Sequence, residues 1–215
     1  MTFYGVRGST PCHGDDIVRY GGNTSCVALH VPGADPILFD MGTGLRYFGA
    51  CRPADETFRG TFLLSHLHWD HIQGLPFFGP ILQPAAEIDV YAPAQPDHRT
   101  VAGVFADTIR PPLFPIDLSA LPGTMRFHDL FDDAFELDHP SGDPNDAIRV
   151  TSRFIPHVGP TLGYRVEWRG RSVVYMSDHQ MPCDGSFEAT PGALDLCRDA
   201  DLVIHDAQYT PEEFE

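Results

Sequence analysis

The stretch Ser65-His66-Leu67-His68-Trp69-Asp70-His71 decides the interpretation of this chain. It places three imidazoles and a carboxylate directly after the apolar run 61–64. Alternate side chains of an extended segment share a face, so His66 and His68 can chelate one ion. Asp70 and His71, where the chain turns, can face a second. Nitrogen and oxygen donors together favour zinc and leave manganese or iron as alternatives.

Two further polar residues stand at the ends of predicted strands. His157 follows the run 153–156, and Asp178 follows the run 173–177. Either residue alone is more typical of a cap or a turn. A centre with two metals needs more imidazole and a bridging carboxylate, and the first motif therefore makes both residues candidate ligands.

Asp40 lies in the apolar run 38–40, before the loop Met41-Gly42-Thr43-Gly44. A buried carboxylate needs polar partners. Asp40 is therefore predicted to orient a ligand histidine, and a helix cap is the alternative. The glycine loop is not a nucleotide-binding P-loop, because no Gly-Lys-Ser/Thr follows it.

Short apolar or alternating runs, bounded by Gly, Pro or Asp, predict many strands. They cover 25–31, 37–40, 61–64, 88–91, 148–155, 162–168, 172–176 and 202–204. Gly170 predicts a hairpin turn over 168–171. A helix is expected over 97–110 with Asp97 as its cap, and another near His71. This mixture favours an α/β or α+β sandwich.

The composition limits the class of protein and its partners. The 215 residues fit a single domain over 1–215. No signal peptide or membrane-spanning run is visible, and we expect a cytoplasmic protein that does not bind membranes. The formal charge is −16, and all 14 basic residues are arginine. This charge disfavours a large nucleic-acid footprint, but it permits a small anionic substrate beside a bound cation. A homodimer is the default assembly.

The cysteines do not form a recognisable framework. Five are widely spaced with no Cys-x-x-Cys pair, and they are interpreted as buried small side chains or free thiols. They are Cys12, Cys26, Cys51, Cys183 and Cys197.

Taken together, these motifs resemble the metallo-β-lactamase fold superfamily, and in finer detail its ribonuclease Z and PhnP-like branch. The resemblance covers nearly the whole chain. Besides the histidine motif and the segment around Asp40, it rests on residues 5–11, 21–26, 71–78, 162–166 and 202–207.

The resemblance implies a four-layer αββα sandwich with two divalent metal ions at one edge. It assigns His66, His68 and His157 to the first ion and Asp70 and His71 to the second. Asp178 is implied as the bridging ligand, Asp40 as a support of the ligand loop, and His205 as structural or supporting.

One departure from the family pattern concerns the last residues. The pattern continues with a catalytic histidine and a final histidine ligand, and neither has a counterpart before Glu215. We therefore expect a domain whose last C-terminal elements are missing, and the alternative is a protein that has lost part of its second metal site. In either case we expect weak or absent turnover by the chain as it stands.

The expected activity is a di-metal hydrolase, and most directly a phosphodiesterase for small or cyclic nucleotides. A metal-bridging hydroxide would be the nucleophile, and Asp70 would orient it as the catalytic carboxylate. Ribonuclease Z-type processing of tRNA 3′ ends is the first alternative, disfavoured by the charge and by the lack of an extended insertion between His71 and His157. Hydrolysis of a thioester or lactam and metal binding without turnover are the others.

Overall fold

The computed structural model describes residues 1–53, 55–182, 186 and 188–207. The chain forms two compact units, Met1–Leu130 and Phe131–Glu215, here called the first and second unit. Each has a sheet of its own, and the single domain expected over 1–215 stays a prediction. Within the described residues, no helix is long and apolar enough to cross a membrane.

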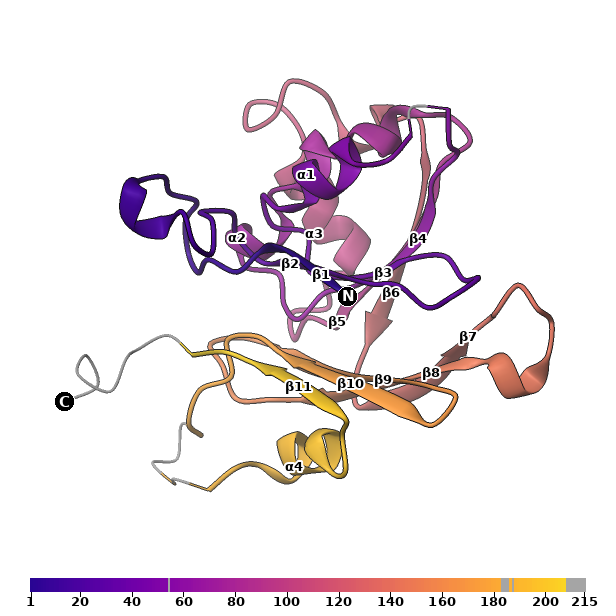
Figure 1. Cartoon of the computed structure of the whole chain (residues 1–215). Coiled ribbons are helices and arrows are strands. Elements are labelled where there is room, and N and C mark those ends of the chain that lie inside the picture. Colours follow the sequence, from indigo (N-terminus) through magenta and orange to yellow (C-terminus); the bar gives the residue numbers. More distant parts are fainter. Residues whose placement is uncertain (54, 183–185, 187, 208–215) are drawn as a thin grey trace. The chain divides into compact units, whose positions relative to one another are not determined.

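The first unit is built on a six-stranded sheet (Figure 1). In spatial order its strands are β1 (Thr2–Gly5), β2 (Cys26–Leu29), β3 (Ile37–Phe39), β4 (Arg59–Leu63), β5 (Glu87–Pro93) and β6 (Thr124–Leu130). The strands from β3 to β6 are parallel, whereas β1 and β2 run antiparallel to their neighbours. Parallel strands end at the same edge, so the segments after β3 and β4 emerge side by side.

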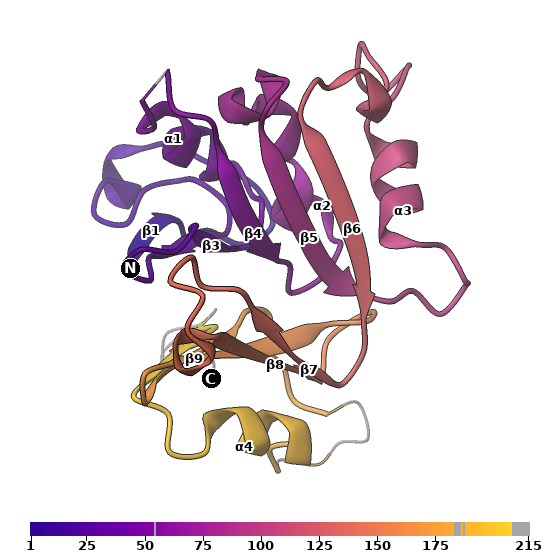
Figure 2. The same cartoon turned by 90° about the vertical axis from the view of Figure 1, so that its right-hand side faces the viewer.

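Helices cover one face of this sheet (Figure 2). They include α1 (Leu45–Ala50), α2 (Trp69–Ile72) and α3 (Val101–Thr108). Short 3-10 turns are η1 (Asp15–Ile17), η2 (Leu75–Phe77), η3 (Gly79–Leu82) and η4 (Leu118–Ala120). Phe48 of α1 and Phe105 of α3 lie in one buried cluster with Phe62 of β4. Burial of this apolar surface is the main force that holds the layers of the unit together.

The expected helix over 97–110 is present but shorter than predicted. It begins at Val101, and its cap is Thr100, whose hydroxyl oxygen accepts the amide proton of Gly103 at 3.1 Å. The prediction of Asp97 as the cap was wrong. The Asp97 side chain instead forms an ion pair with Arg99, and His98 between them has a φ of 61°, outside the helical region.

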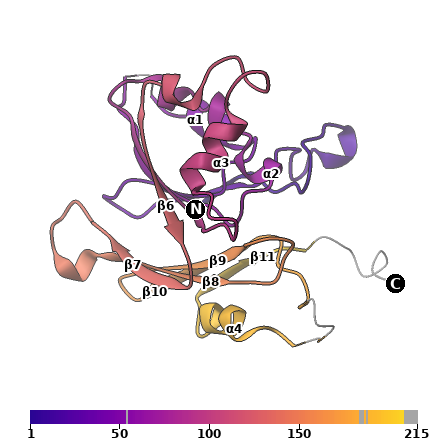
Figure 3. The same ribbon diagram turned by 180° about the vertical axis from the view of Figure 1, so that it is seen from behind.

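Within its described residues, the second unit contains a five-stranded sheet and one α-helix, and both are seen in Figure 3. Its strands are β11 (Leu202–His205), β10 (Arg171–Met176), β9 (Leu162–Trp168), β8 (Ile148–Phe154) and β7 (Asp133–Leu137), in spatial order. The other elements are α4 (Pro191–Cys197) and η5 (Pro144–Asp146). Leu196 of α4 packs against Ile155 and Val174 in a buried cluster.

The predicted hairpin joins β9 to β10. Arg171 pairs with Trp168, and both turn residues have positive φ angles, 46° at Arg169 and 71° at Gly170. All eight predicted strands are present in the two units, which confirms the mixed α/β class. Four of the five cysteines are free thiols, and Cys183 lies outside the described residues.

Candidate metal centre

The first unit places Asp40 and the histidine motif at the same sheet edge. Asp40 follows β3, and the motif follows β4, its parallel neighbour. The amide of Asp40 donates to the carbonyl of Leu63 at 3.2 Å, so the pairing continues one residue beyond β3. The motif therefore follows a strand end, as predicted, and the role of its residues as metal ligands stays a prediction.

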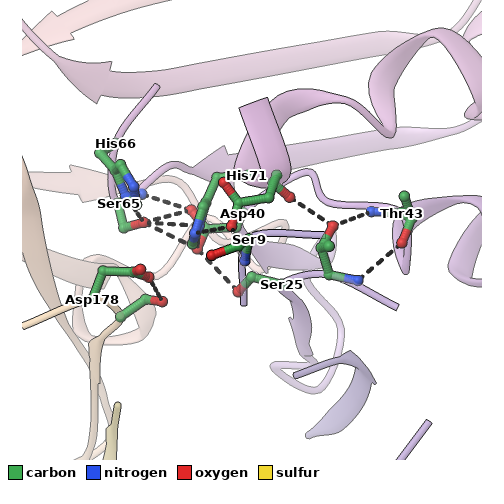
Figure 4. Close-up of polar contacts among 11 residues, drawn as sticks. Ser9, Ser25, Asp40, Thr43, Ser65, His66, His71 and Asp178 are labelled. Atoms are coloured by element: carbon green, nitrogen blue, oxygen red, sulfur yellow. Dashed lines mark hydrogen bonds and ion pairs between the residues drawn. The ribbon is translucent and has the colours of Figure 1, made fainter. Parts of the chain in front are cut away.

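Asp40 is fully buried and receives several hydrogen bonds (Figure 4). Its Oδ1 accepts the Ser65 amide at 2.7 Å, and its Oδ2 lies 2.8 Å from Nδ1 of His71. The hydroxyl of Ser25 donates to Oδ2 at 3.2 Å. These donors offset the cost of burying a charge. A φ of 59° at Asp40 turns the chain so that the carboxylate faces the motif.

This network determines which ring nitrogens are protonated. The carboxylate of Asp40 can only accept, so Nδ1 of His71 carries the proton and Nε2 keeps its electron pair. Ser65 Oγ donates its single proton to Asp40 at 2.9 Å and therefore accepts from His66 Nδ1 at 3.0 Å. These tautomers leave both rings with an electron pair on Nε2, the form in which a histidine can bind a metal.

The imidazoles of the motif lie close together. The ring centroid of His66 is 4.4 Å from that of His68 and 4.1 Å from that of His71. Potential ligand nitrogens of His66 lie within 4.8 Å of one on His68 and of one on His71. His66 and His71 are buried, whereas His68, the residue before α2, is exposed. The first unit therefore brings its predicted ligands together.

Asp70 is held from two sides. Its Oδ2 accepts the amide of Ser9 at 2.8 Å and lies 3.4 Å from Nε2 of His71. Burial alone would raise the pKa of Asp70, but a protonated His71, which can donate from Nε2, and the Ser9 amide hold this pKa below its usual range. When His71 is neutral with its proton on Nδ1, the Ser9 amide is the donor that remains. Asp70 is consequently a carboxylate at neutral pH, as a metal ligand or a base must be.

The second unit places both of its predicted residues directly after strands. His157 follows the end of β8, and its Nδ1 lies 3.1 Å from the side-chain oxygen of Gln180. Asp178 follows β10 with a φ of 56°, and its carboxylate accepts the Ser177 hydroxyl at 2.5 Å (Figure 4). Gln180 can fix the ring of His157 as Asp40 fixes that of His71.

A second group of polar residues lies at the same strand ends of this unit. Nδ1 of His179 is 2.8 Å from Nε2 of His205, and His205 Nδ1 is 2.6 Å from the carbonyl oxygen of Asp206. Burial, and then the negative charge of Asp178, raise the pKa of Asp206, while His205 and His157 oppose the change. These contacts agree with the supporting role expected for His205.

Sequence reasoning missed the residues that fix the ligands. Ser65 could have been found, because it directly precedes His66 and follows a strand. Ser9 could not, since only its backbone amide contacts Asp70, 61 positions away. Nearly every residue type offers a backbone amide, so the identity of Ser9 does not predict this contact.

The family model "Beta-lactamase superfamily domain" matches residues 37–215. The chain therefore belongs to this superfamily, whose metallo-β-lactamase-fold members include metal-dependent hydrolases. The match confirms the fold inferred from the motifs. The donor set also fits divalent metals, since imidazoles of known tautomer and an ionised carboxylate lie side by side in the first unit.

Curated relatives carry the name ribonuclease Z. One, from Mycobacterium avium (strain 104), is 29% identical over 178 residues, which is 75% of this chain and 58% of that protein. Another, from Synechococcus sp. (strain CC9311), is 26% identical over 258 residues, covering 99% of this chain and 76% of that protein. The chain thus spans less than two thirds of the first relative.

Solved structures share the fold at lower identity. The short form of human tRNase Z has a TM-score of 0.65 and 21% identity, and the match covers 98% of this chain and 79% of that one. A diphosphatase from the PhnP family has a TM-score of 0.57 and 16% identity, with 84% and 59% covered.

Proposed function

We propose that this chain carries a two-metal phosphodiesterase site. The observation that supports the proposal is the network around Asp40, which sets the tautomers of His66 and His71 before any ion is bound. Preorganised ligands bind metal without a large ordering cost. Zinc is the metal we propose, because imidazole dominates the donor set.

The proposed ligands are those that the family resemblance implies. His66, His68 and His157 hold one ion, Asp70 and His71 hold the other, and Asp178 bridges them. When bound, two such ions would activate water and neutralise the charge of a phosphodiester. The chain's own contribution is to hold these side chains in position.

Asp70 is the proposed catalytic carboxylate. The Ser9 amide and His71 fix its Oδ2 and keep it ionised. It would orient the attacking water and accept its proton, which is general base catalysis. Replacement of Asp70 by asparagine keeps the shape and removes the base, so turnover should fall by at least about 100-fold.

Small or cyclic nucleotides are the proposed substrates. A formal charge of −16 repels a long polyanion, whereas a short anion meets mainly the local field of the bound cations. The PhnP-family neighbour is named a diphosphatase, which is in keeping with a small phosphate compound. Processing of tRNA 3′ ends is the second candidate, because the curated relatives are named ribonuclease Z.

Metal analysis followed by a competition assay tests these proposals. The zinc-loaded chain is given a cyclic nucleotide and a tRNA precursor together, and both products are quantified. Preferential hydrolysis of the cyclic nucleotide supports the first candidate, and preferential cleavage of the precursor supports the second. Hydrolysis of only a thioester or lactam, or binding of metal without any turnover, contradicts both.

Separate variants test the ligand assignment. His68→Ala and Asp178→Asn should each lower the zinc content measured by mass spectrometry, whereas the exposed-residue control His98→Ala should not. Unchanged stoichiometry in both ligand variants would refute the site. The proposed cytoplasmic location and homodimer are tested by cell fractionation and light scattering.

A further inference from the structure

A small pocket lies in the first unit beside residues 65–71, here called the ligand loop. It has a volume of about 240 Å³ and is lined by Asn23, Thr43, Arg46, Tyr47, Gly74 and Phe77. We call it the Arg46 pocket. Pockets for drug-sized ligands usually occupy about 300–1,000 Å³. This one therefore suits a fragment of that size, such as one base or a sugar phosphate.

Hydrogen bonds connect the wall of the Arg46 pocket to the ligand loop (Figure 4). The amide of Thr43 donates to Thr24 Oγ1 at 2.8 Å, and this hydroxyl donates to the backbone carbonyl of Asp70 at 2.7 Å. Thr24 is fully buried, so the chain of contacts is shielded from water. The wall of the pocket is thus joined to the backbone of Asp70 through one buried side chain, Thr24.

The backbone makes this connection rigid. Gly74 follows α2 closely, and a Cβ added to it would lie 2.0 Å from the carbonyl oxygen of Gly42. Its amide donates to the Met41 carbonyl at 2.8 Å. Two loops that pack this tightly hold the pocket and the ligand loop in a fixed relation.

Arg46 gives the pocket an available positive charge. Ten of the 14 arginines form ion pairs with acidic side chains within the described residues, and Arg46 is not among them. Its side chain is exposed. Arg46 is one of four arginines with no acidic partner among the described residues, and it is the one that lines this pocket. A guanidinium binds phosphate through two parallel hydrogen bonds, and phosphate is thus the anion it favours.

Two aromatic rings flank this charge. Tyr47 is 53% exposed and Phe77 is 62% exposed. The Phe77 ring packs edge-on against Phe114, at 6.1 Å between centroids and 83° between planes, which holds it on one side. Exposed, anchored aromatics beside an arginine form the platform on which proteins stack nucleic-acid bases.

We propose that the Arg46 pocket is a nucleotide subsite. The Arg46 guanidinium binds a phosphate, and Tyr47 and Phe77 stack against the base. This inference rests on the proposed phosphodiesterase function and extends it, because it names a nucleoside phosphate as the substrate portion that is recognised. Inorganic phosphate or a simple alkyl phosphate would use only half of the pocket.

Calorimetric titration of the full chain with adenosine 5′-monophosphate tests the subsite. EDTA is present, so that binding does not depend on the metal ions. Wild type is compared with Arg46→Gln and Phe77→Ala. Arg99→Gln is the charge control, since Arg99 is also exposed but is paired with Asp97. Phe131→Ala is the aromatic control, at 61% exposure.

The two pocket variants should each weaken binding by about 5-fold or more, the range for loss of one stacked base or one phosphate contact. Both controls should bind like wild type. Adenosine and inorganic phosphate, titrated separately, should bind more weakly than the nucleotide. Equal affinity in all five proteins, no binding to wild type, or phosphate binding as tightly as the nucleotide would overturn the subsite.

A measurement on wild type guards against misfolded variants. Amide chemical shifts of Arg46, Tyr47 and Gly74 should move on addition of the nucleotide, and unmoved shifts there would count against the pocket. The two proposals also fail separately. Nucleotide binding that depends on Arg46, without any diester hydrolysis by the zinc-loaded chain, removes the phosphodiesterase and keeps the subsite. Diester hydrolysis by the zinc-loaded chain, with nucleotide binding that does not depend on Arg46, removes the subsite and keeps the phosphodiesterase.

Discussion

Asp40 is the residue that orients the histidines of the first unit, His71 directly and His66 through Ser65. Its buried carboxylate accepts hydrogen bonds from Ser65, Ser25 and His71. Loss of the charge would leave some of these donors badly matched, because an amide offers only one oxygen. The geometry of two proposed ligands is therefore controlled by a residue that is not itself proposed to touch metal.

Asp40→Asn tests this dependence. Asparagine tolerates the left-handed φ of 59°, so the backbone should be little strained. We expect zinc affinity to fall about 10- to 100-fold and the free energy of unfolding to fall by about 1–3 kcal/mol. Competition with a chelating dye and urea unfolding measure the two effects. Asp97→Asn, an exposed site, is the control, and equal losses there would show that the effect is not specific to the network.

At the same scale, the sequence predicted the six candidate ligands but not the contacts that orient them. His66, His68, Asp70 and His71 are close in sequence, and their strand-end position followed from the apolar run before them. Ser25 could not be identified as a partner of Asp40, because it is an ordinary residue type 15 positions away. The pairing of β2 with β3 brings it to Asp40, and the pairing of β3 with β4 brings Ser65 there.

At the scale of elements, the strands of the sheet interiors were predictable and the polar ones were not. β6 and β7 alternate polar and partly buried residues and present no apolar run. β6 nevertheless forms, because it pairs along seven residues with β5. Helix α4 has a recognisable start, Thr190 as cap and Pro191 at the first position, but its seven residues are too few for a clear period.

Asp89 on β5 gives an element-scale prediction about acid stability. The Arg126 guanidinium on β6, helped by His128, holds the pKa of Asp89 below its usual range despite burial. A carboxyl whose pKa is lower in the folded state stabilises the protein above its unfolded pKa, about 3.9. This contribution is lost as the pH falls through the folded pKa.

The free energy of unfolding of Arg126→Gln should therefore fall less steeply than that of wild type as the pH drops below 4. Urea unfolding at a series of pH values from about 2 to 5 measures the slope for wild type and variant. Arg149→Gln is the matched control, because the Arg149 guanidinium is 3.6 Å from Glu136 and both side chains are largely exposed. A parallel displacement of the Arg126→Gln curve at all pH values would contradict the assignment to Asp89.

The loop after α2 gives a second prediction at this scale. Gly74→Ala would place a Cβ 2.0 Å from the Gly42 carbonyl oxygen, which forces α2 away from the glycine loop. We expect a loss of about 1–3 kcal/mol in unfolding free energy and reduced zinc content. Gly79→Ala is the control, since nothing lies within 4 Å of its added Cβ. It should change stability by less than about 0.5 kcal/mol.

At the scale of the molecule, the proposed metal ions bind the folded chain and not the unfolded one. Metal binding should therefore raise the free energy of unfolding. Zinc held at 100 times its dissociation constant adds about 2.7 kcal/mol to the free energy of unfolding. Urea unfolding followed by circular dichroism, with zinc and with EDTA, measures this difference. His157→Ala and His68→Ala, one variant from each unit, should each reduce it. A zinc effect that survives both would place the ion elsewhere.

The buried carboxylate of Asp40 also sets an order of events during synthesis. Its hydrogen-bond partner His71 lies 31 positions further along the chain. A nascent polypeptide that has emerged only as far as β3 cannot yet provide this partner for the carboxylate. The turn at Asp40 can therefore form its hydrogen bond to His71 only after the segment through α2 has been translated. Until then its carboxylate stays hydrated. We expect the loop 65–71 to close in one late step rather than residue by residue.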